Sequence, residues 1–569
     1  MALDPSPLTN GHHAPVAAAT NGHSAAVPIV DPTSARRPVE SVEVESDNLT
    51  YTDEALLAKY VYHSNQVKKQ GDKYKVKPVE QTFEFKTMRK VPKTGLMLVG
   101  WGGNNGTTLS ATILANKHNI SWNTRDGTQT PNYIGSLVRG STLRLGNDEQ
   151  GKDVFVPFSD IVPMVHPNDL VVGGWDISSL PLDKAMRRAK VLEWDLQRQL
   201  VPHMAELKPL PSIYYPTFIN ANQDERADNL IPGNDKQKHL EQVRADIRNF
   251  KQQNGLDQVI VLWTANTERY ANIVPGVNDT AENLLKAVEQ SHAEVAPSTI
   301  FAMASILEGV PYINGAPQNT FVPGCIELAE KHKAFIGGDD FKSGQTKVKS
   351  VLADYLVNAG IKPLLIASYN HLGNNDGKNL DAPAQFRSKE ISKSSVVDDM
   401  VEANPLLYKK LAARTADSKD GKVKGHDVEH PDHVVKICYM PAAGDDKKAL
   451  DDYTSEISMG GRNTLSIYNT CQDSLLATPL IIDLCLLAEL MTRVTYKDAS
   501  STEHKPLYSV LGLLSYMLKA PATAPGVAPI NSLGRQRGAL ETFLKACLGL
   551  QTGSDLINFT RMGVEPTTA

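Results

Sequence analysis

The residues with the clearest potential for chemistry form a glycine-rich stretch, Gly-Trp-Gly-Gly-Asn-Asn-Gly, at residues 100–106. A strand-like apolar run ends at residue 99, and a helical pattern covers residues 107–115. A glycine turn between a strand and a helix can bring free backbone N–H groups close to a pyrophosphate. The spacing departs from Gly-x-Gly-x-x-Gly because Asn105 stands at the third glycine position. The motif alone leaves a tight structural turn and a dinucleotide site equally open, whereas the missing Gly-Lys-Thr argues against a nucleoside-triphosphate loop.

The ribose of a dinucleotide usually meets a carboxylate at the end of a neighbouring strand. Asp176 directly follows the strand-like run 170–174, whereas Asp126 lies in a polar loop with no strand before it. Asp176 is therefore the better candidate, and a turn or helix-capping aspartate is the alternative interpretation.

A second candidate anion site stands at the start of a later helical pattern. It consists of Ser343, Gly344, Gln345 and Thr346. Hydroxyls and free N–H groups at a helix N-terminus suit a phosphate. Simple capping of the helix by Ser343 is the favoured alternative when this segment is taken alone.

Four lysines could supply positive charge. Lys389 and Lys393 are four residues apart, so a helix would place them on one face, where a bound anion would remove their mutual repulsion. A solvated lysine face is the default interpretation of that pair. Lys447 lies in a predicted turn. Lys519 ends an apolar helical run, residues 507–519, where the helix dipole favours a cation.

A scaffold of alternating strands and helices must position these candidates, and the hydrophobic pattern predicts one. The strand-like runs are residues 95–100, 170–174, 259–263, 334–337 and 364–367. The helical stretches are residues 183–200, 236–253, 280–290, 479–494, 507–519 and 535–549. Such alternation is typical of an α/β protein with a doubly wound sheet.

The composition changes along the chain and predicts several segments. Residues 1–45 are rich in Ala, Pro, Asn, His and Thr and are expected to form a disordered tail. Residues 46–94 are expected to form an N-terminal segment that packs on the core. Residues 346–473 are more polar, with a charged loop at 417–426 and an alternating stretch at 433–440. They predict a second domain, inserted into a first domain that is made of residues 95–345 and 474–569.

Composition and charge limit the expected partners and compartment. The 569 residues include 59 Lys and Arg and 64 Asp and Glu, a formal net charge of −5, so neither nucleic acid nor a membrane is expected as a partner. The 5 cysteines are odd in number and lack Cys-x-x-Cys spacing, so neither a disulfide framework nor a metal site is expected. Residues 1–34 do not resemble a signal peptide, and the most apolar run, residues 479–491, is shorter than a membrane span. A cytoplasmic protein is expected.

Taken together, the unusual strings in this chain resemble the myo-inositol-1-phosphate synthase family of the eukaryotic, fungal-like type. The resemblance extends in chain order over roughly residues 50 to 560. The matching strings are residues 100–106, 174–178, 262–270, 314–324, 338–347, 368–376 and 392–399.

The resemblance implies an isomerase that converts D-glucose 6-phosphate to 1L-myo-inositol 1-phosphate, the first step of inositol biosynthesis. In that family NAD oxidises C5, a proton leaves C6, the enolate attacks the C1 aldehyde, and C5 is reduced again. The implied fold is a modified Rossmann NAD-binding domain completed by the C-terminal segment, with an inserted α/β domain for catalysis and tetramerisation. The implied partners are glucose 6-phosphate and a homotetramer, and an ammonium or other cation activator is left open.

The resemblance also implies site residues, each by its match to a family motif. The catalytic set is Lys389, Lys393, Lys447 and Lys519, with Asp340, Asp445 and Asp473 orienting them. Lys389 and Lys519 would act at the C5 oxygen and in proton transfer, and Lys447 would act near C1. The substrate-binding set is Ser343, Gly344, Gln345, Thr346, Asn370, Asn374 and Asp376, with Lys393 also at the phosphate. The cofactor-binding set is Gly100, Gly102, Gly103, Asn104, Asn105, Gly106, Asp176, Ser178, Arg226, Thr264, Ala265, Thr267 and Gly315.

Two other functions compete with the isomerase. An NAD-dependent sugar-phosphate dehydrogenase with net NADH release would use the glycine turn but would need neither the second anion site nor four lysines. A non-catalytic NAD-binding scaffold would not need the lysines at all. One departure from the family is Cys438, which stands where the family usually has Lys. That position is outside the catalytic set, so the departure does not change the functional expectation.

Overall fold

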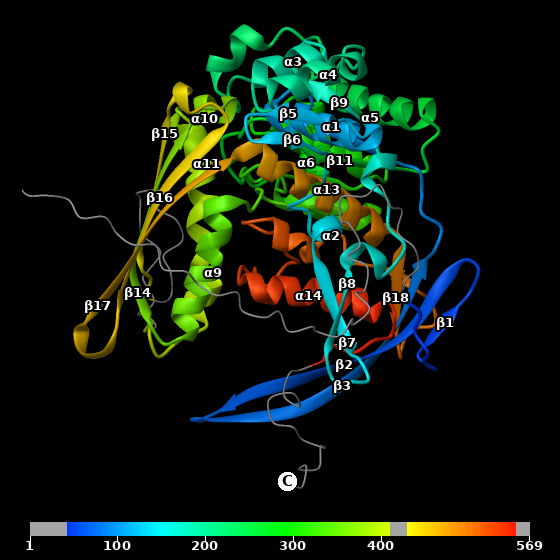
Figure 1. Ribbon diagram of the computed structural model, residues 1–569, viewed down its shortest axis with the longest axis vertical. Helices are drawn as coiled ribbons and strands as arrows, with labels where there is room; N and C mark the ends of the chain where they lie inside the picture. Colours follow the sequence, from blue (N-terminus) through cyan, green and yellow to red (C-terminus); the bar gives the residue numbers. More distant parts are fainter. Residues whose placement is uncertain (1–41, 410–428, 554–569) are drawn as a thin grey trace, which may run out of the picture.

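The computed structural model describes residues 42–409 and 429–553 (Figure 1). Its centre is a six-stranded parallel sheet in the order β10-β9-β4-β11-β12-β13. The strands are β4 (Thr94–Val99), β9 (Val171–Asp176), β10 (Leu210–Pro211), β11 (Gln258–Trp263), β12 (Tyr312–Asn314) and β13 (Ile336–Gly337). The chain leaves β4 toward β9 on one side and later returns to β11 on the other. This reversal opens a crevice at the carboxyl ends of the three strands, which is where α/β sheets bind ligands.

Helices cover both faces of this sheet. Along β4, Leu96 and Leu98 join one buried cluster, while Met97 and Val99 join the other, as the alternation of a strand requires. The first cluster is packed mainly by α1 (Asn104–His118), α3 (Leu182–Ala189), α4 (Trp194–Met204), α13 (Asp473–Thr492) and α14 (Leu533–Ala546). The second is packed by α5 (Lys236–Gln253), α6 (Ala281–Glu289), α7 (Pro297–Leu307) and α8 (Pro323–His332). The predicted doubly wound α/β class is confirmed.

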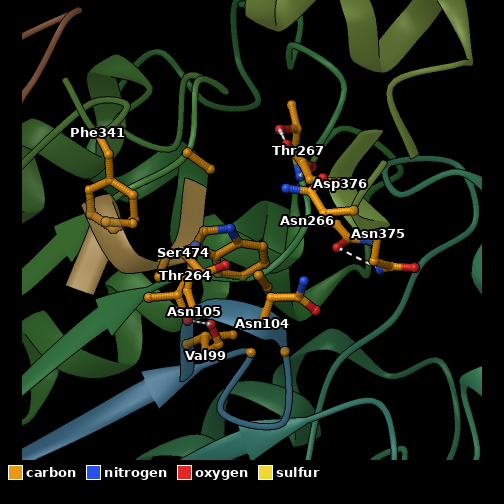
Figure 2. A pocket seen from close by; sticks show the side chains of 18 of the residues that line it. Val99, Asn104, Asn105, Thr264, Asn266, Thr267, Phe341, Asn375, Asp376 and Ser474 are labelled. Carbon is orange, nitrogen blue, oxygen red and sulfur yellow. Dashed lines mark hydrogen bonds between the residues drawn. The ribbon is translucent and has the colours of Figure 1, made fainter. Parts of the chain in front are cut away.

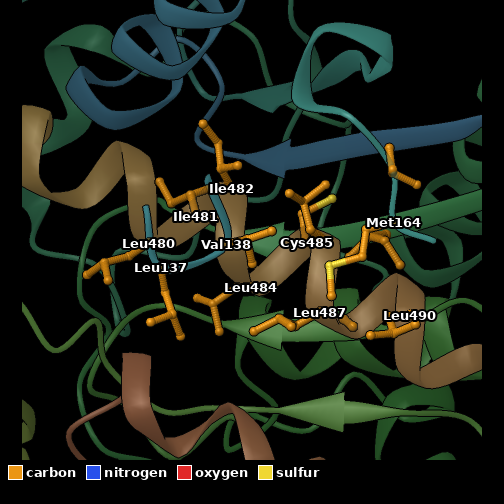
Figure 3. Packing of buried hydrophobic residues seen from close by; sticks show 14 of the residues in the cluster. Leu137, Val138, Met164, Leu480, Ile481, Ile482, Leu484, Cys485, Leu487 and Leu490 are labelled. Carbon is orange, nitrogen blue, oxygen red and sulfur yellow. The ribbon is translucent and has the colours of Figure 1, made fainter. Parts of the chain in front are cut away.

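The long helix α13 carries the C-terminal part of the chain back into the first cluster. Figure 3 shows Leu480, Ile481 and Leu484 of this helix packed among Val138 and neighbouring apolar side chains. The helix begins at Asp473, six residues before the predicted start, because Pro479 lies inside it without ending it. It is long and apolar enough to span a membrane by length and composition, but 83% of its most apolar window is buried inside the protein. It is therefore a core helix. The expectation that this segment is too short to cross a membrane was wrong, because the helix has 20 residues.

Two other predicted helices differ from the structure. The predicted helix 183–200 is two helices, because Lys190 adopts a left-handed conformation (φ 54°) that closes α3 before α4 begins. The predicted helix 507–519 is mostly extended and keeps only the short 3₁₀ helix η7 (Gly512–Met517). Its flanks pair with the parallel-sheet region through the bridges Ile336–Val510 and Phe341–Leu518, so the backbone there is extended rather than helical.

A second, four-stranded sheet lies beside the first and has the order β15-β14-β16-β17. Its strands are β14 (Lys362–Leu372), β15 (Asp432–Tyr439), β16 (Asp446–Glu456) and β17 (Arg462–Gln472). Strand β15 is parallel to β14, whereas β16 and β17 are antiparallel to their neighbours. Its associated helices are α9 (Gly344–Asn358), α10 (Asn375–Asn379), α11 (Pro383–Ser394) and α12 (Asp398–Glu402) (Figure 1). The alternating stretch noted at residues 433–440 forms strand β15.

The N-terminal strands form a third sheet together with strands from the C-terminal part. Its order is β1 (Leu49–Tyr51), β2 (Ala55–Gln70), β3 (Lys73–Met88), β18 (Val494–Asp498) and β19 (Lys505–Pro506).

Two hairpins complete the strands, β5 (Trp122–Thr124) with β6 (Gly127–Gln129) and β7 (Thr142–Asn147) with β8 (Asp153–Pro157). The remaining short helices are α2 (Leu137–Gly140), η1 (Phe158–Asp160), η2 (Pro167–Asp169), η3 (Ala221–Arg226), η4 (Ser395–Val397), η5 (Pro441–Ala443) and η6 (Ser458–Gly460). Residues 1–41 of the predicted tail and the predicted charged loop 417–426 lie outside the described residues.

Candidate active site

A cavity opens at the carboxyl ends of β4, β9 and β11. Figure 2 shows Asn104, Asn105 and Thr264 gathered near these strand ends with Ser474, while Thr267 and Asp376 form a second group farther along. The predicted residues that line it are Gly100, Gly103, Asn104, Asn105, Asp176, Arg226, Thr264, Ala265, Thr267, Gly315, Asp340, Ser343, Asn374, Asp376, Lys389, Lys447, Asp473 and Lys519. The predicted residues outside its wall are Gly102, Gly106, Ser178, Gly344, Gln345, Thr346, Asn370, Lys393 and Asp445. One cavity therefore joins most of the predicted cofactor residues to three of the four predicted catalytic lysines.

The glycine turn brings backbone very close to neighbouring backbone. Gly100 has a φ of +93°, and a Cβ there would lie 2.7 Å from the backbone nitrogen of Ala265. A Cβ at Gly106 would lie 2.3 Å from the carbonyl oxygen of Trp101. Helix α1 begins at Asn104, and no side chain caps its first N–H groups. The turn is therefore both a tight structural turn and the opening of a helix whose N–H groups can bind an anion.

The carboxylate of Asp176 lies at the end of β9, where a ribose would lie in a Rossmann fold. It accepts a hydrogen bond from the N–H of Ser178 (2.9 Å), so the turn interpretation also holds. Arg226 approaches it from η3 at 3.6 Å. Arg188, on α3, donates to the carbonyl of Gly102 (2.7 Å) and to the hydroxyl of Ser178 (3.2 Å). The sequence analysis missed Arg188, because nothing in its local pattern separates it from the neighbouring Arg187.

Asp340 is the centre of the lysine cluster. Its buried carboxylate lies 3.0 Å from the Nζ of Lys389 and 3.1 Å from the Nζ of Lys519, and it also accepts from the hydroxyl of Ser392. Burial alone would raise the pKa of Asp340, but the two ammonium groups hold it below its usual range. One carboxylate thus serves two lysines that come from chain segments 130 residues apart, since 519 − 389 = 130.

The two lysines that share Asp340 differ in their pKa values. Burial lowers the pKa of Lys519 to about 7, because the attraction of Asp340 is opposed by the positive charges of Lys389 and Lys447. Burial also acts to lower the pKa of Lys389, but Asp340, Asp376 and Asp473 outweigh it, and that pKa is raised. Near neutral pH the pair can therefore supply one ammonium and one amine that gains and loses its proton.

The environments of Lys519 and Lys447 differ from the sequence predictions. Lys519 is not at the end of a helix, since it follows an extended residue and its partner is Asp340. Lys447 is not in a turn but in strand β16, where it donates to Asp473 at the start of α13 (2.5 Å). Burial would raise the pKa of Asp473, yet Lys447 holds it below its usual range. Lys389 and Lys393 both lie on helix α11, which meets the condition under which they would share one face.

Asp445 orients neighbouring groups rather than a lysine. It accepts from the Nδ2 of Asn104 (3.1 Å) and from the hydroxyl (2.7 Å) and N–H (2.9 Å) of Ser474. Burial raises its pKa, although these donors oppose the shift. The contact with Asn104 ties the second sheet to the glycine turn.

Polar contacts from the loop after β14 also join the two sheets. Asp376 accepts from the N–H of Thr267 (2.9 Å), and Asn374 donates to Asp473 (3.2 Å). Asn375 donates to Asn266 (3.1 Å), and both line the cavity (Figure 2). The sequence analysis did not single out Asn266, Asn375 or Ser474, although each adjoins a residue that it did single out.

The second anion site is built at the first turn of α9. Ser343 is the N-cap residue, but its side chain makes no capping hydrogen bond, so simple capping does not account for it. Lys393 is buried and donates to the side-chain oxygens of Gln345 (3.0 Å) and Asn370 (3.1 Å). Among the described residues it forms no ion pair, and burial together with the charges of the other lysines holds its pKa well below its usual range. Of this group only Ser343 reaches the cavity wall.

Comparisons with known proteins agree with this architecture. A model of an NAD-binding family described as myo-inositol-1-phosphate synthase matches residues 94–545. The chain is 57% identical to human inositol-3-phosphate synthase 1 over 89% of its own length and 88% of that protein. It is 55% identical to inositol-3-phosphate synthase of Saccharomyces cerevisiae, over 91% and 97% of the two chains.

Solved structures give the same relationship. The crystal structure of inositol-3-phosphate synthase from Caenorhabditis elegans superposes with a TM-score of 0.86, at 50% identity, and covers 94% of this chain and 100% of that chain. A related protein from Thermotoga maritima, at 16% identity and a TM-score of 0.54, shares the fold. With both the sequence matches and this superposition covering nearly the whole chain, the protein belongs to the myo-inositol-1-phosphate synthase family.

Proposed function

We propose that this protein is an isomerase that converts D-glucose 6-phosphate to 1L-myo-inositol 1-phosphate with NAD as its cofactor. The observation that carries the proposal is a single cavity that is lined by the glycine turn and by three lysines, each of which is ion-paired with an aspartate. An ordinary dehydrogenase needs one base beside the reacting hydroxyl. This reaction instead develops negative charge in turn on the C5 oxygen, an enolate and the C1 oxygen, and three lysine side chains can serve these steps by stabilising charge or by taking up a proton.

The residues around the glycine turn fit NAD. Gly100 and Gly103 line the cavity, the uncapped start of α1 supplies N–H groups for a pyrophosphate, and Asp176 can accept from a ribose hydroxyl. When bound there, NAD would supply reversible hydride chemistry at C5, with no net redox change over the whole reaction. Arg188 supports this end of the cavity by fixing the carbonyl of Gly102.

The three lysines would have different roles in proton transfer and in charge stabilisation. Lys519, with its pKa near 7, accepts the proton that the C5 hydroxyl releases. Lys389 keeps its proton and stabilises charge on the same oxygen. Lys447, held by Asp473, would stabilise the C1 oxygen as the ring closes. Asn374 and Asp376 would orient the sugar hydroxyls between these two ends.

The phosphate of the substrate would bind at the start of α9. Ser343 faces the cavity, and the uncapped first turn of α9 offers free N–H groups. Lys393 supplies a buried amine that lacks a carboxylate partner among the described residues. Gly344, Gln345, Thr346 and Asn370 complete this proposed subsite.

The activity can be tested with purified protein, NAD and glucose 6-phosphate that carries deuterium at C5. Inositol phosphate that retains the deuterium, without build-up of NADH absorbance, is the expected result, because the hydrogen taken from C5 returns to C5. Lys389→Ala and Lys519→Ala should lower the rate by about 10³-fold or more. Lys236→Met is the matched control, because this buried lysine donates to the carbonyls of His292 and Val295 and does not line the cavity formed by the described residues. Net NADH without inositol phosphate would instead support a sugar-phosphate dehydrogenase, and NAD binding without any product would support a scaffold.

A homotetramer and two structural domains are also part of the proposal. The outer face of the four-stranded sheet exposes Tyr369, Leu450 and Tyr468, which stand directly opposite one another on β14, β16 and β17. A row of exposed apolar side chains on a sheet favours contact with another copy of the chain. Residues 95–345 and 474–569 would form the NAD-binding domain, and residues 346–473 would form the domain for catalysis and tetramerisation. A cytoplasmic location is expected for such an enzyme.

A further inference from the structure

Helix α11 carries a stripe of buried polar side chains that the mechanism above leaves unused. The stripe consists of Gln385, Ser388 and Ser392, whose spacing of three and then four residues places them on one face of the helix. All three are buried, and Ser388 and Ser392 are only 0% and 1% exposed. Polar groups this deeply buried are stable in a protein when each finds a hydrogen-bond partner, so the partners show what the stripe does.

Two members of the stripe donate to the backbone of the parallel-sheet part of the protein. The amide of Gln385 donates to the carbonyl oxygen of Phe218 (2.8 Å), and the hydroxyl of Ser388 donates to the carbonyl oxygen of Glu268 (2.8 Å). Phe218 follows strand β10 and Glu268 follows strand β11 in the chain. These two contacts fasten α11 to loops that follow the parallel strands, and neither acceptor is a reacting group.

Ser392 differs from the other two because its acceptor is a side chain of the site. Its hydroxyl donates to Oδ2 of Asp340, the carboxylate that holds both Lys389 and Lys519. The Nζ of Lys519 lies 3.1 Å from the same oxygen, whereas the Nζ of Lys389 lies 3.0 Å from the other oxygen, Oδ1. The hydroxyl and Lys519 therefore share one oxygen, and the other oxygen is left to Lys389.

The backbone of Asp340 is held on both sides, so its carboxylate can move only by rotation of the side chain. Its N–H donates to the carbonyl of Ala316 (3.1 Å), and its carbonyl accepts from the N–H of Lys519 (2.9 Å). The two lysines have long, flexible stems that can follow a carboxylate as it turns. Ser392 has a short side chain on a helix, so its hydroxyl limits the position of the carboxylate more narrowly than either lysine does.

We propose that Ser392 is a positioning residue for the reaction: its hydroxyl holds the carboxylate of Asp340 between Lys389 and Lys519, so that both amines stay at the C5 oxygen. Without this contact the carboxylate would turn toward one lysine and away from the other. Ser392 acts through Asp340 and touches neither the substrate nor NAD. The inference rests on the proposed function, in which Lys389 and Lys519 act on the same oxygen.

The test compares Ser392→Ala with Ser388→Ala in the full-length protein with NAD. Alanine removes only the hydroxyl oxygen and is well tolerated in a helix. Each variant loses one buried hydrogen bond between the same face of α11 and the parallel-sheet part, so both should lower the urea midpoint of unfolding by similar amounts. The two variants therefore differ only in whether the lost acceptor is a backbone carbonyl or the carboxylate of Asp340.

The kinetic constants for glucose 6-phosphate should separate the two variants. Ser392→Ala should lower kcat by about 10- to 100-fold, the loss expected when reacting groups are misplaced by a fraction of an ångström to 1 Å. Its KM and its affinity for NAD should change by no more than about twofold, because the lost contact serves the chemical step rather than binding. Ser388→Ala should keep kcat within about threefold of the wild-type value.

Two further variants tie the loss to the hydroxyl and to Asp340. Ser392→Thr retains a hydroxyl and should recover most of the kcat that Ser392→Ala loses. Ser392→Ala should have little added effect in an Asp340→Asn background, because groups that act as a unit are not additive. Circular dichroism and NAD binding establish that each variant is folded. If Ser392→Ala does not fold, Ser392→Cys replaces it, since a thiol fills the same position but is a weak donor.

Four outcomes are decisive. An unchanged kcat in Ser392→Ala, or an equal loss in Ser388→Ala, overturns the positioning role, and the equal loss reduces Ser392 to a docking contact of α11. A folded Ser392→Thr as slow as Ser392→Ala shows that the hydroxyl is not the cause and also overturns it. Full additivity with Asp340→Asn shows that Ser392 acts independently of that carboxylate. Absence of inositol phosphate from the wild-type enzyme overturns the proposed function instead.

Discussion

Asp340 sets the chemical difference between two lysines that would otherwise be equivalent. Lys389 and Lys519 both lie about 3 Å from its carboxylate, and both are buried. The negative charges of Asp376 and Asp473 also raise the pKa of Lys389. The positive charges of Lys389 and Lys447 lower the pKa of Lys519. Environments that push the pKa values of two like groups apart are a general way of assigning one as an acid and the other as a base. This assignment makes two predictions at the level of single residues.

The first prediction concerns the acidic limb of the pH profile. Lys519 accepts a proton only in its amine form, which is populated above a pKa of about 7, so kcat/KM should fall about tenfold per pH unit below that value. Asp340 raises the pKa of Lys519, so Asp340→Asn should move this limb to lower pH as well as lower the maximal rate. The profile of kcat/KM for glucose 6-phosphate between pH 5 and pH 8 measures both effects. If kcat/KM falls at the same pH in Asp340→Asn as in the wild-type enzyme, the titrating group is the substrate phosphate rather than Lys519.

The second prediction separates proton transfer from charge stabilisation. An arginine guanidinium keeps its positive charge but cannot lose its proton in a protein. Lys519→Arg should therefore lower kcat by about 10³-fold, close to the effect of Lys519→Ala, whereas Lys389→Arg should retain much more activity than Lys389→Ala. Single-turnover rates in folded, NAD-binding variants provide the measurement. Equal losses in Lys519→Arg and Lys389→Arg would contradict the separate roles.

At the level of elements, α13 connects the core to the site. Its first residue, Asp473, holds Lys447, while its middle turns fill the cluster on one face of the parallel sheet. Asp483, within the same helix, accepts from the hydroxyl of Ser136 and from the N–H groups of Leu137 and Val138, which begin α2. One helix thus caps another that is more than 300 residues earlier in the chain. Both oxygens of the Asp483 carboxylate are used, so an amide cannot replace it fully.

This cap leads to a stability prediction. Asp483→Ala leaves two buried N–H groups and the hydrogen of the Ser136 hydroxyl without an acceptor and should cost roughly 2–4 kcal/mol. Asp235→Ala is the matched comparison, because Asp235 caps α5 from an exposed position, where the loss should be about 1 kcal/mol. Urea denaturation, followed by tryptophan fluorescence, compares the two variants. A loss in Asp483→Ala no greater than that in Asp235→Ala would show that water or movement of α2 satisfies these groups.

At the level of the whole molecule, the two sheets form the site jointly. The parallel sheet supplies the glycine turn, Asp176 and Thr264, whereas the four-stranded sheet and its helices supply Lys389 and Lys447. Two contacts hold the four-stranded sheet in place against the parallel sheet. They join Asp376 to Thr267 and Asp445 to Asn104. The other face of the four-stranded sheet carries the exposed row Tyr369, Leu450 and Tyr468. Assembly through this face would stiffen the sheet that holds the lysines.

The assembly prediction targets this row. Leu450→Lys combined with Tyr468→Lys places two charges side by side on an apolar surface and should convert the proposed tetramer to smaller species. Light scattering coupled to gel filtration measures the mass. Tyr62→Lys with Tyr74→Lys is a matched control, because these exposed tyrosines lie on the β2–β3 hairpin instead. An unchanged mass in Leu450→Lys/Tyr468→Lys would exclude this face as the subunit interface.

Features that depend on neighbours along the chain could be predicted from the amino-acid sequence. The strand β4, the glycine turn and helix α1 follow from a short apolar run, from glycines that permit close backbone contact, and from helical periodicity. The same local rules located α5 at its observed bounds and the strands β9 and β11. The family resemblance then supplied the residues of the site, because several long strings match together and in order.

Only the tertiary structure decided which distant groups became partners. The sequence placed Lys519 against a helix dipole and Lys447 in a turn, but chain pairing makes the first extended beside Asp340 and the second part of a strand beside Asp473. Likewise, nothing local joins Lys349 to His433 or Arg188 to Gly102. The physical reason is that periodicity reports which face of an element is apolar, whereas the partner of a buried charge depends on how those faces pack. Such charges are desolvated together, and their pKa values are therefore properties of the folded chain.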